Sequence, residues 1–359
     1  MSNAEISNSQ MPNAGMLNTK SLPTQTPGKK KMTYKQSEAI AFYILLAPFL
    51  IMLIAIKIVP VGWSLIMSFT NYTGWNLDSF VFSGLRNYMR MPSDPFFVES
   101  IVSTLIIVAF MVPTTIFVSF SYALLLNNDL KGSGLFRAVF YMPAILPIVV
   151  TALMWKLMFI YNGGVISGIL VFLGFEPINW LGVTHQRDAL FIMLVWSGGS
   201  GMLTYLAGLK SIPTELYEAG TIDGAGAWRK FLNITLPSIT PVLFFNLVNG
   251  MIASFQIFQQ PVLLAQGAGD SKLSVTPAKN NYTYIVHAFQ QFFQQNRFGY
   301  GLALIWVSFI VSISLTRLIF YTQRYWVHYE TDVEGTSGRK AKRALRKAAK
   351  AAARKGAAS

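Results

Sequence analysis

The hydrophobic pattern of this chain consists of long, nearly uninterrupted apolar stretches separated by short polar segments. A helix needs about 20 mostly apolar residues to cross the hydrocarbon core of a bilayer. A shorter apolar piece, Val165–Leu173, is flanked by glycines and is expected to lie at the membrane interface or to re-enter. Six stretches are long enough to span, and the first of them can continue to Ser68: Ala39–Pro60, Ile101–Leu126, Ala138–Tyr161, Ala189–Leu209, Ser238–Leu264 and Gly301–Tyr321. The pattern therefore predicts an all-α integral membrane protein with six transmembrane helices.

Composition and charge support a membrane environment. Hydrophobic residues make up 53% of the chain and charged residues 12%, whereas about a quarter of a soluble domain is charged. The net charge is +14, but the basic residues lie at the termini and in short loops, which fits anionic lipid and the positive-inside rule better than nucleic acid. Both termini are therefore expected on the cytoplasmic side of the membrane.

The distribution of apolar and basic residues divides the chain into three expected parts. Residues 1–38 are polar and form a flexible cytoplasmic arm, residues 39–323 form the transmembrane domain, and residues 324–359 form a basic cytoplasmic tail. The alternation of Ala with Lys and Arg in Gly338–Ser359 fits either a disordered extension or a basic helix that lies on anionic lipid or reaches a partner.

Several kinds of chemistry are disfavoured by the residues present. The chain has no cysteine, and His185, His287 and His328 are far apart, so neither a disulfide nor a metal site is expected. Glu99 and Asp188 lie at the edges of spans, which argues against a proton-coupled secondary transporter and against a membrane-embedded enzyme. The chain has no Gly-x4-Gly-Lys-Ser/Thr loop, so ATP hydrolysis is expected in a separate protein.

The loop between the fourth and fifth spans, residues 210–237, has a distinct pattern. A short helix is expected over Pro213–Asp223, with Glu215 near its positive end and Gly224 as its stop. A second helical stretch, Ala227–Ile234, follows, and the fifth span is expected to begin at Pro237. Ala219 and Gly220 make one face small, while Glu218 and Asp223 offer carboxylates to a cationic partner. Another protein would move this helix as a rigid lever; the alternative is an ordinary solvated loop helix.

The loop resembles the EAA signature of bacterial ABC importer permeases, in which Glu-Ala-Ala is followed at fixed spacing by Gly and by Ile-x-Leu-Pro. Glu218, Ala219 and Gly224 occupy the required register, and Gly220 replaces the second Ala. The final motif of the signature is present as Ile234, Leu236 and Pro237.

Outer segments are similar to those of the carbohydrate-uptake branch, which contains maltose-type and glycerol-phosphate-type importers, and the likeness extends over residues 39–329. These segments are Ser83–Phe97, Asn179–Leu181 and Arg297–Leu302. Many relatives carry a Gly-Gly-Pro-containing stretch after the fifth span, and Gln266–Pro277 departs from it.

This resemblance implies a five-helix permease core plus one N-terminal helix, in a bacterial plasma (inner) membrane. It also implies a second homologous permease, two ATPase subunits that use ATP and Mg, and an extracytoplasmic solute-binding protein, with no cofactor bound by this subunit. The implied solute is a sugar or a sugar-like molecule, and a permease for amino acids, peptides or ions is the alternative. The residues expected to couple to the ATPase are Glu215, Glu218, Ala219, Gly220, Asp223 and Gly224.

The fifth span predicts a solute pathway. Asn246, Asn249, Gln256 and Gln260 fall on one face of a continuous helix, with Phe255 beside them. Amides and aromatic rings suit the hydroxyls and C–H faces of a sugar, although amides also join helices within membranes.

The fourth span carries a run of small residues after Trp196, which extends to Gly201. This run is expected to be a hinge or a solute-binding kink, or a site of close helix packing. Trp196 joins the residues of the fifth span as a pathway candidate.

Overall fold

The computed structural model describes residues 34–128, 131–265 and 276–329, and their regular structure is helical. An isolated antiparallel bridge between Thr70 and Phe82 is the β-type pairing found in these residues. Five helices of the described chain are long and apolar enough to span a membrane, or six if one bent pair counts as a span. The predicted all-α membrane fold is confirmed. The expectations for the arm up to residue 33, for residues 266–275 and for the tail from residue 330 lie outside the described residues.

The chain divides into two compact units, one ending at Pro60 and one beginning at Val61. The first contains α1 (Tyr34–Met52) and the π-helical η1 (Leu53–Ile58), and α2 (Val59–Ser68) crosses the boundary. As one candidate span, this segment covers Glu38–Ser68. The first helix thus begins earlier than Ala39 and reaches Ser68.

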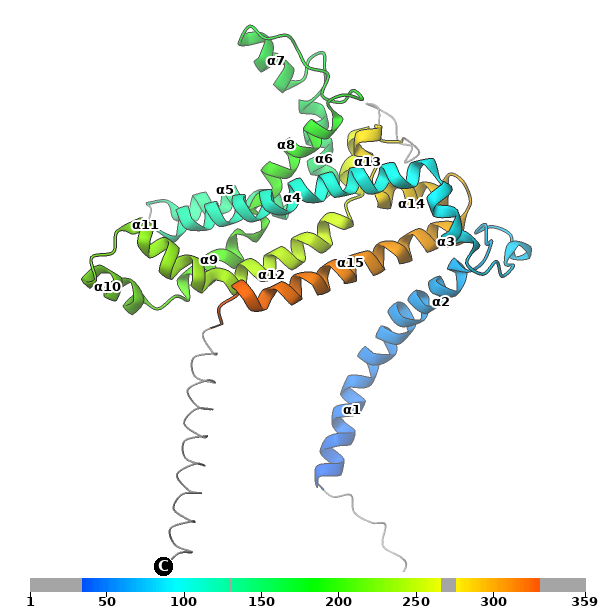
Figure 1. Ribbon diagram of the computed structural model, residues 1–359, viewed down its shortest axis with the longest axis horizontal. Helices are drawn as coiled ribbons and strands as arrows, with labels where there is room; N and C mark the ends of the chain where they lie inside the picture. Colours follow the sequence, from blue (N-terminus) through cyan, green and yellow to red (C-terminus); the bar gives the residue numbers. More distant parts are fainter. Residues whose placement is uncertain (1–33, 129–130, 266–275, 330–359) are drawn as a thin grey trace, which may run out of the picture. The chain divides into compact units, whose positions relative to one another are not determined.

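The second unit is organised around three long helices that lie side by side: α4 (Pro95–Asn127), α12 (Leu236–Phe255) and α15 (Phe298–Trp326) (Figure 1). Buried Ile107 of α4 packs in one cluster with Leu190 and Met193. Further along α4, Leu126 packs with Met202 in a second cluster. A single helix, α4, therefore contributes to both main parts of the core.

The third span is not the continuous helix that was predicted over Ala138–Tyr161. Its two parts, α5 (Ser133–Ile145) and α6 (Ile148–Met158), are bent by 98° relative to each other. Leu146 is extended, with φ −69° and ψ 135°, because the ring of Pro147 disfavours the helical conformation in the residue before it.

The fifth span also differs from the prediction, at both of its ends. Helix continues without interruption from α11 (Ala227–Lys230) through the π-helical η5 (Phe231–Thr235) into α12, and Pro237 lies in the first turn of α12. Because the helix is unbroken at this point, the fifth span does not begin at Pro237.

At its other end α12 stops at Phe255, and the chain turns before α13 (Gln259–Ala265) begins. Pro261 has no N–H and its ring would clash with a carbonyl of a preceding turn, which favours a new helix start just before it.

The fourth span has three parts: α8 (Gln186–Trp196), the 3₁₀ segment η4 (Ser197–Gly201) and α9 (Met202–Lys210). The short apolar piece at residues 165–173 forms α7 (Val165–Phe172). Figure 1 places α10 (Thr214–Ile222) and α14 (Tyr284–Phe293) at opposite ends of the second unit. The remaining short elements are α3 (Arg86–Arg90), η2 (Leu77–Ser79), η3 (Met91–Ser93) and η6 (Lys279–Asn281).

Candidate functional site

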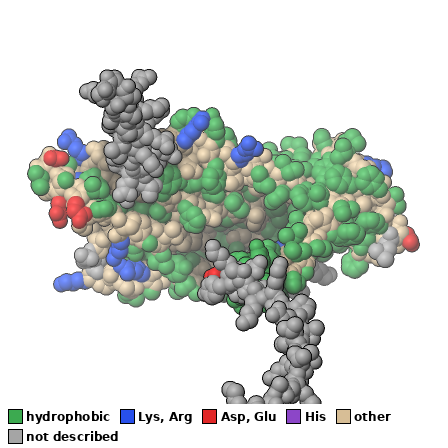
Figure 2. All heavy atoms as spheres, turned by 90° about the horizontal axis from the view of Figure 1, so that it is seen from below, with side chains coloured by type: hydrophobic (Ala, Val, Ile, Leu, Met, Phe, Trp, Pro, Cys, Tyr) green, Lys and Arg blue, Asp and Glu red, His purple; other side chains and the backbone are tan. Residues whose placement is uncertain are grey.

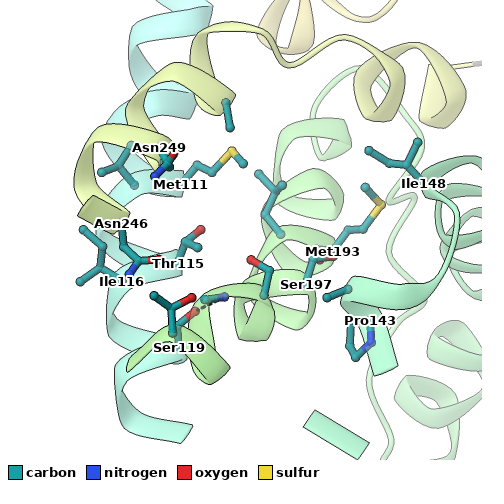
Figure 3. A pocket seen from close by; sticks show the side chains of 18 of the residues that line it. Met111, Thr115, Ile116, Ser119, Pro143, Ile148, Met193, Ser197, Asn246 and Asn249 are labelled. Carbon is teal, nitrogen blue, oxygen red and sulfur yellow. Dashed lines mark hydrogen bonds between the residues drawn. The ribbon is translucent and has the colours of Figure 1, made fainter. Parts of the chain in front are cut away.

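A cavity of about 480 Å³ lies among α4, the bend between α5 and α6, the fourth span, α12 and α13. Figure 3 shows Thr115 and Ser119 of α4 and Asn246 and Asn249 of α12 on one side of it, and Met193 and other residues on the other. None of its lining residues in the described chain is Asp, Glu, Lys, Arg or His. The cavity is therefore an uncharged, partly polar space inside a helical bundle.

Half of the residues predicted for the pathway line this cavity. Asn246 and Asn249 do so from α12, and Gln260 does so from α13. The two asparagine side chains each donate an N–H to the carbonyl four residues earlier, to Val242 at 2.9 Å and to Phe245 at 2.8 Å. One N–H of each amide is thus held by its own helix, which leaves the amide oxygen available to a ligand.

The other predicted residues lie elsewhere, so the single polar face along one helix is wrong. Gln256 follows the end of α12 and is exposed, and Phe255 is buried against Val108 and Val112 of α4. The indole of Trp196 packs edge-on against Trp155, with ring centroids 5.9 Å apart. The predicted polar face does not form because α12 ends before Gln256. Without a continuous helix, the spacing of the four amide residues no longer places them on one side.

The glycine-rich run of the fourth span both packs closely and lines the cavity. A Cβ on Gly199 would lie 2.6 Å from the carbonyl oxygen of Phe140 in α5. The hydroxyl of Ser119 donates to the carbonyl of Gly198 and accepts from the N–H of Gly201. Ser197, Ser200 and Gly201 also line the cavity. Close helix packing and a position beside the cavity are thus compatible for this run.

Several lining residues were missed by the sequence analysis because they carry small hydroxyls. Thr115 and Ser119 come from α4, Thr151 from α6, and Thr204 and Tyr205 from α9. Single hydroxyl residues are ordinary in membrane helices, so their spacing gives no signal until the bends of the third and fourth spans direct them to one space.

The loop after the fourth span forms the predicted short helix. α10 covers Thr214–Ile222, and Gly224 follows it in the left-handed conformation with φ +70°, which is where glycine ends helices well. Glu215, Glu218, Ala219 and Asp223 are exposed.

Apolar side chains near α10 are exposed as well: Ile222 is 88% and Trp228 is 71% exposed. Figure 2 shows acidic and basic side chains together at the end of the molecule that carries α10. This end thus presents carboxylates beside exposed apolar groups.

The opposite face of α10 is attached to the start of the fifth span. The hydroxyls of Tyr217 and Thr235 are 3.0 Å apart, and Lys230 donates to the hydroxyl of Thr221 at 2.6 Å. A Cβ on Gly220 would lie 3.2 Å from the Cδ1 of Ile234. Part of the space beside Gly220 is therefore occupied by Ile234 of this chain.

A buried polar network lies at the other end of the unit. Asp94 caps α4 by accepting from the N–H of Phe96 at 3.0 Å, and its carboxylate also contacts His287 of α14 at 3.2 Å and the hydroxyl of Tyr300 at 2.9 Å. Burial lowers the pKa of His287, while the negative charge of Asp94 acts in the opposite direction. This network fixes α14 to α4 and α15.

Comparisons with known proteins agree with this architecture. Residues 95–325 match the sequence family described as "Binding-protein-dependent transport system inner membrane component". The chain is 35% identical to the probable ABC transporter permease protein YesP of Bacillus subtilis, a match that covers 85% of this chain and 97% of that protein. It is 32% identical to the trehalose/maltose transport system permease protein MalF of Thermococcus litoralis, over 81% of this chain and 96% of the relative.

A solved structure shares the fold. It is a chain of a bacterial alginate ABC transporter in complex with an alginate-bound periplasmic protein, with a TM-score of 0.69 and 19% identity over 80% of this chain and 95% of that chain.

The close packing at Gly199 leads to a prediction about stability. We expect Gly199→Ala to lower the free energy of unfolding by about 1–3 kcal/mol, because the new methyl group would overlap a backbone oxygen and force a helix to move. Gly250→Ala is the matched control, since no atom lies within 4 Å of its Cβ position. Thermal unfolding of the two purified variants in detergent tests this, and equal melting temperatures would contradict it.

Proposed function

The chain belongs to the family of binding-protein-dependent transport system inner membrane components, and from this premise we propose that it carries a sugar or a sugar-like solute through its central cavity. It is a multi-pass inner-membrane permease of an ABC importer, a transport component without catalytic activity. The observation that carries the proposal is the convergence of amides and hydroxyls from separate helices on one uncharged cavity.

The cavity chemistry favours a sugar over the alternative solutes. Asn246, Asn249 and Gln260 supply amides, which donate and accept hydrogen bonds as sugar hydroxyls require. An amino acid or an ion would need opposite charges in the site, because an unpaired charge away from water is costly. A relative with 32% identity is named for trehalose and maltose transport, which supports the same class.

The connection between α10 and the fifth span suggests how an ATPase would act on this cavity. Movement of α10 would pass through the Tyr217–Thr235 and Thr221–Lys230 contacts to η5, and from there to α12, which carries Asn246 and Asn249. Isolated π-helical turns are frequent at functional sites within helices. We therefore assign η5 as the element through which a displacement of α10 changes the orientation of α12.

The exposed surface of α10 supports the proposed partners. Glu215, Glu218 and Asp223 would pair with cations of an ATPase, and Ile222 and Trp228 would fill apolar pockets beside them. Ala219 and Gly224, both exposed, complete this surface.

Two ATPases that use ATP and Mg, a second homologous permease and an extracytoplasmic binding protein would complete the assembly. The lipid bilayer surrounds it, and no nucleic acid is involved. α10 and both termini would face the cytoplasm.

The docking role of Glu218 can be tested by co-purification. We expect Glu218→Lys to lose the ATPase when the tagged protein is purified from native membranes in mild detergent, since the substitution reverses a charge in the contact. Glu176→Lys, in the loop after α7, is the control and should retain the ATPase. Retention of the ATPase by both variants, with transport intact, would exclude α10 as its docking element.

The proposed orientation can be tested with single cysteines, because the chain has none of its own. We expect a membrane-impermeant maleimide to label Glu176→Cys from outside intact spheroplasts and to label Asp223→Cys after the membrane is opened. Labelling of Asp223→Cys in intact spheroplasts would place α10 on the extracytoplasmic side.

The role of the amides is tested by transport kinetics. We expect Asn246→Ala and Asn249→Ala each to raise the KM of solute uptake about 2–10-fold, the effect of one or two lost hydrogen bonds. Gln256→Ala should leave KM unchanged, because Gln256 lies outside the cavity. An effect of Gln256→Ala alone would move the pathway away from the cavity.

A further inference from the structure

A second cavity, of about 420 Å³, lies at the end of the second unit that carries α14 (Figure 1). Its wall is formed by α3, η3, the start of α4, α14 and the turn that leads into α15. We call it the α14 cavity. Its lining shares no described residue with the lining of the central cavity. A ligand in the α14 cavity would therefore occupy a different site from a solute in the central cavity.

The α14 cavity contains two guanidinium groups and one carboxylate, from Arg90, Arg297 and Asp94. The ion pairs found within the described chain include neither arginine. The carboxylate of Asp94 already contacts His287 and Tyr300, and this side chain is only 10% exposed. Both arginines are exposed. The cavity thus presents cations to solvent, while its own acid is occupied by the network beneath it.

Other contacts hold the two arginines in place. The guanidinium carbon of Arg90 lies 5.3 Å from the centroid of the Tyr300 ring. The backbone N–H of Arg297 donates to a carbonyl of α14 at 2.8 Å. Just before it, Asn296 has a φ of +51°, and its side chain accepts from the indole N–H of Trp75 at 2.8 Å. A non-glycine residue keeps this conformation where its surroundings hold it, so the turn that carries Arg297 has a defined shape.

The chemistry of the lining favours a carboxylate that is accompanied by hydroxyls. A planar guanidinium matches a carboxylate with two parallel hydrogen bonds. Ser93 and Gln295 also line the α14 cavity and are exposed, and their side chains can donate to and accept from hydroxyl groups. The volume lies in the range of small-molecule sites, whereas one acidic side chain of a partner protein would leave most of it empty.

We propose that the α14 cavity is a binding site for a small hydroxylated carboxylic acid, such as a uronic acid. The carboxylate would bind Arg90 and Arg297, and the hydroxyls would bind Ser93 and Gln295. The bound acid would join α3 to the turn before α15. This site goes beyond the proposed transport function, because it lies outside the cavity to which that function is assigned.

The test measures binding of galacturonate and glucuronate by equilibrium dialysis, with galactose and glucose as the neutral counterparts. The protein is the membrane complex, purified through the tagged full-length chain and washed free of the binding protein. We expect saturable binding of at least one uronate, with a Kd at least tenfold lower than that of its neutral counterpart. The same uronate should raise the melting temperature of the complex, because it binds the folded protein.

Substitutions locate the bound acid. We expect Arg90→Gln and Arg297→Gln each to raise the Kd about 10–100-fold, the effect of a lost hydrogen bond between charged groups. Arg86→Gln, which removes a charge from the same helix α3 but lies outside the cavity lining, is the control and should leave the Kd unchanged. Gln295→Glu keeps both arginines and places a second carboxylate in the cavity, so it should weaken binding without a loss of stability in the absence of ligand.

Three results would overturn the proposal. One is the absence of saturable binding of both uronates, and another is equal binding of a uronate and its neutral counterpart. The third is a Kd that does not change in Arg297→Gln and Gln295→Glu. Asn249→Ala gives a further check, since a weaker uronate binding in this variant would place the acid in the central cavity. The uptake kinetics of the central-cavity variants test sugar transport separately, so either proposal can fail without the other.

Discussion

The requirement that a backbone inside a bilayer satisfies its own hydrogen bonds shapes the whole structure. Irregular backbone at membrane depth is tolerated where it is buried in protein or borders a cavity. Besides the π-helical η1 and η5, the described spans change conformation at Leu146–Pro147, at Ser197–Gly201 and after Phe255. Each of these last three places borders the central cavity, since Leu146, Ser197 and Gln260 all line it. These three irregular places therefore lie where the backbone borders a cavity.

A similar constraint applies to the positions of charged side chains in the second unit. The exposed carboxylates of α10 lie at one end of the second unit, and the network around Asp94 lies near α14 at the other. Between them the described cavity lining is uncharged, because an unpaired charge far from water has no compensating hydration. In the proposed function, a partner that binds the charged surface of α10 would act on the neutral cavity through η5 and α12.

Much of this could be predicted from the order of apolar and polar residues. The spans, the short helix after the fourth span and its glycine stop are local features, since they depend on length, on helix-terminal residues and on the conformational freedom of Gly224. The EAA-like register around Glu218 also indicated the family, which the match over residues 95–325 confirms. The bends were harder to predict, because prolines such as Pro113 and Pro241 occur inside helices of this chain, whereas Pro147 lies between two helices.

The sequence by itself determined the membrane environment, the approximate positions of the spans, the family and the short helix after the fourth span. Tertiary structure decided which polar residues share the cavity. Asn246 and Asn249 reach it as predicted, whereas Gln256 does not, because α12 ends before it and the helical periodicity is lost. Thr151 and Tyr205 gave no signal in the sequence, since a lone hydroxyl in an apolar helix is ordinary. Their meeting at one cavity depends on the 98° bend of the third span and on the packing of α9 against α4, which are long-range contacts that no local pattern encodes.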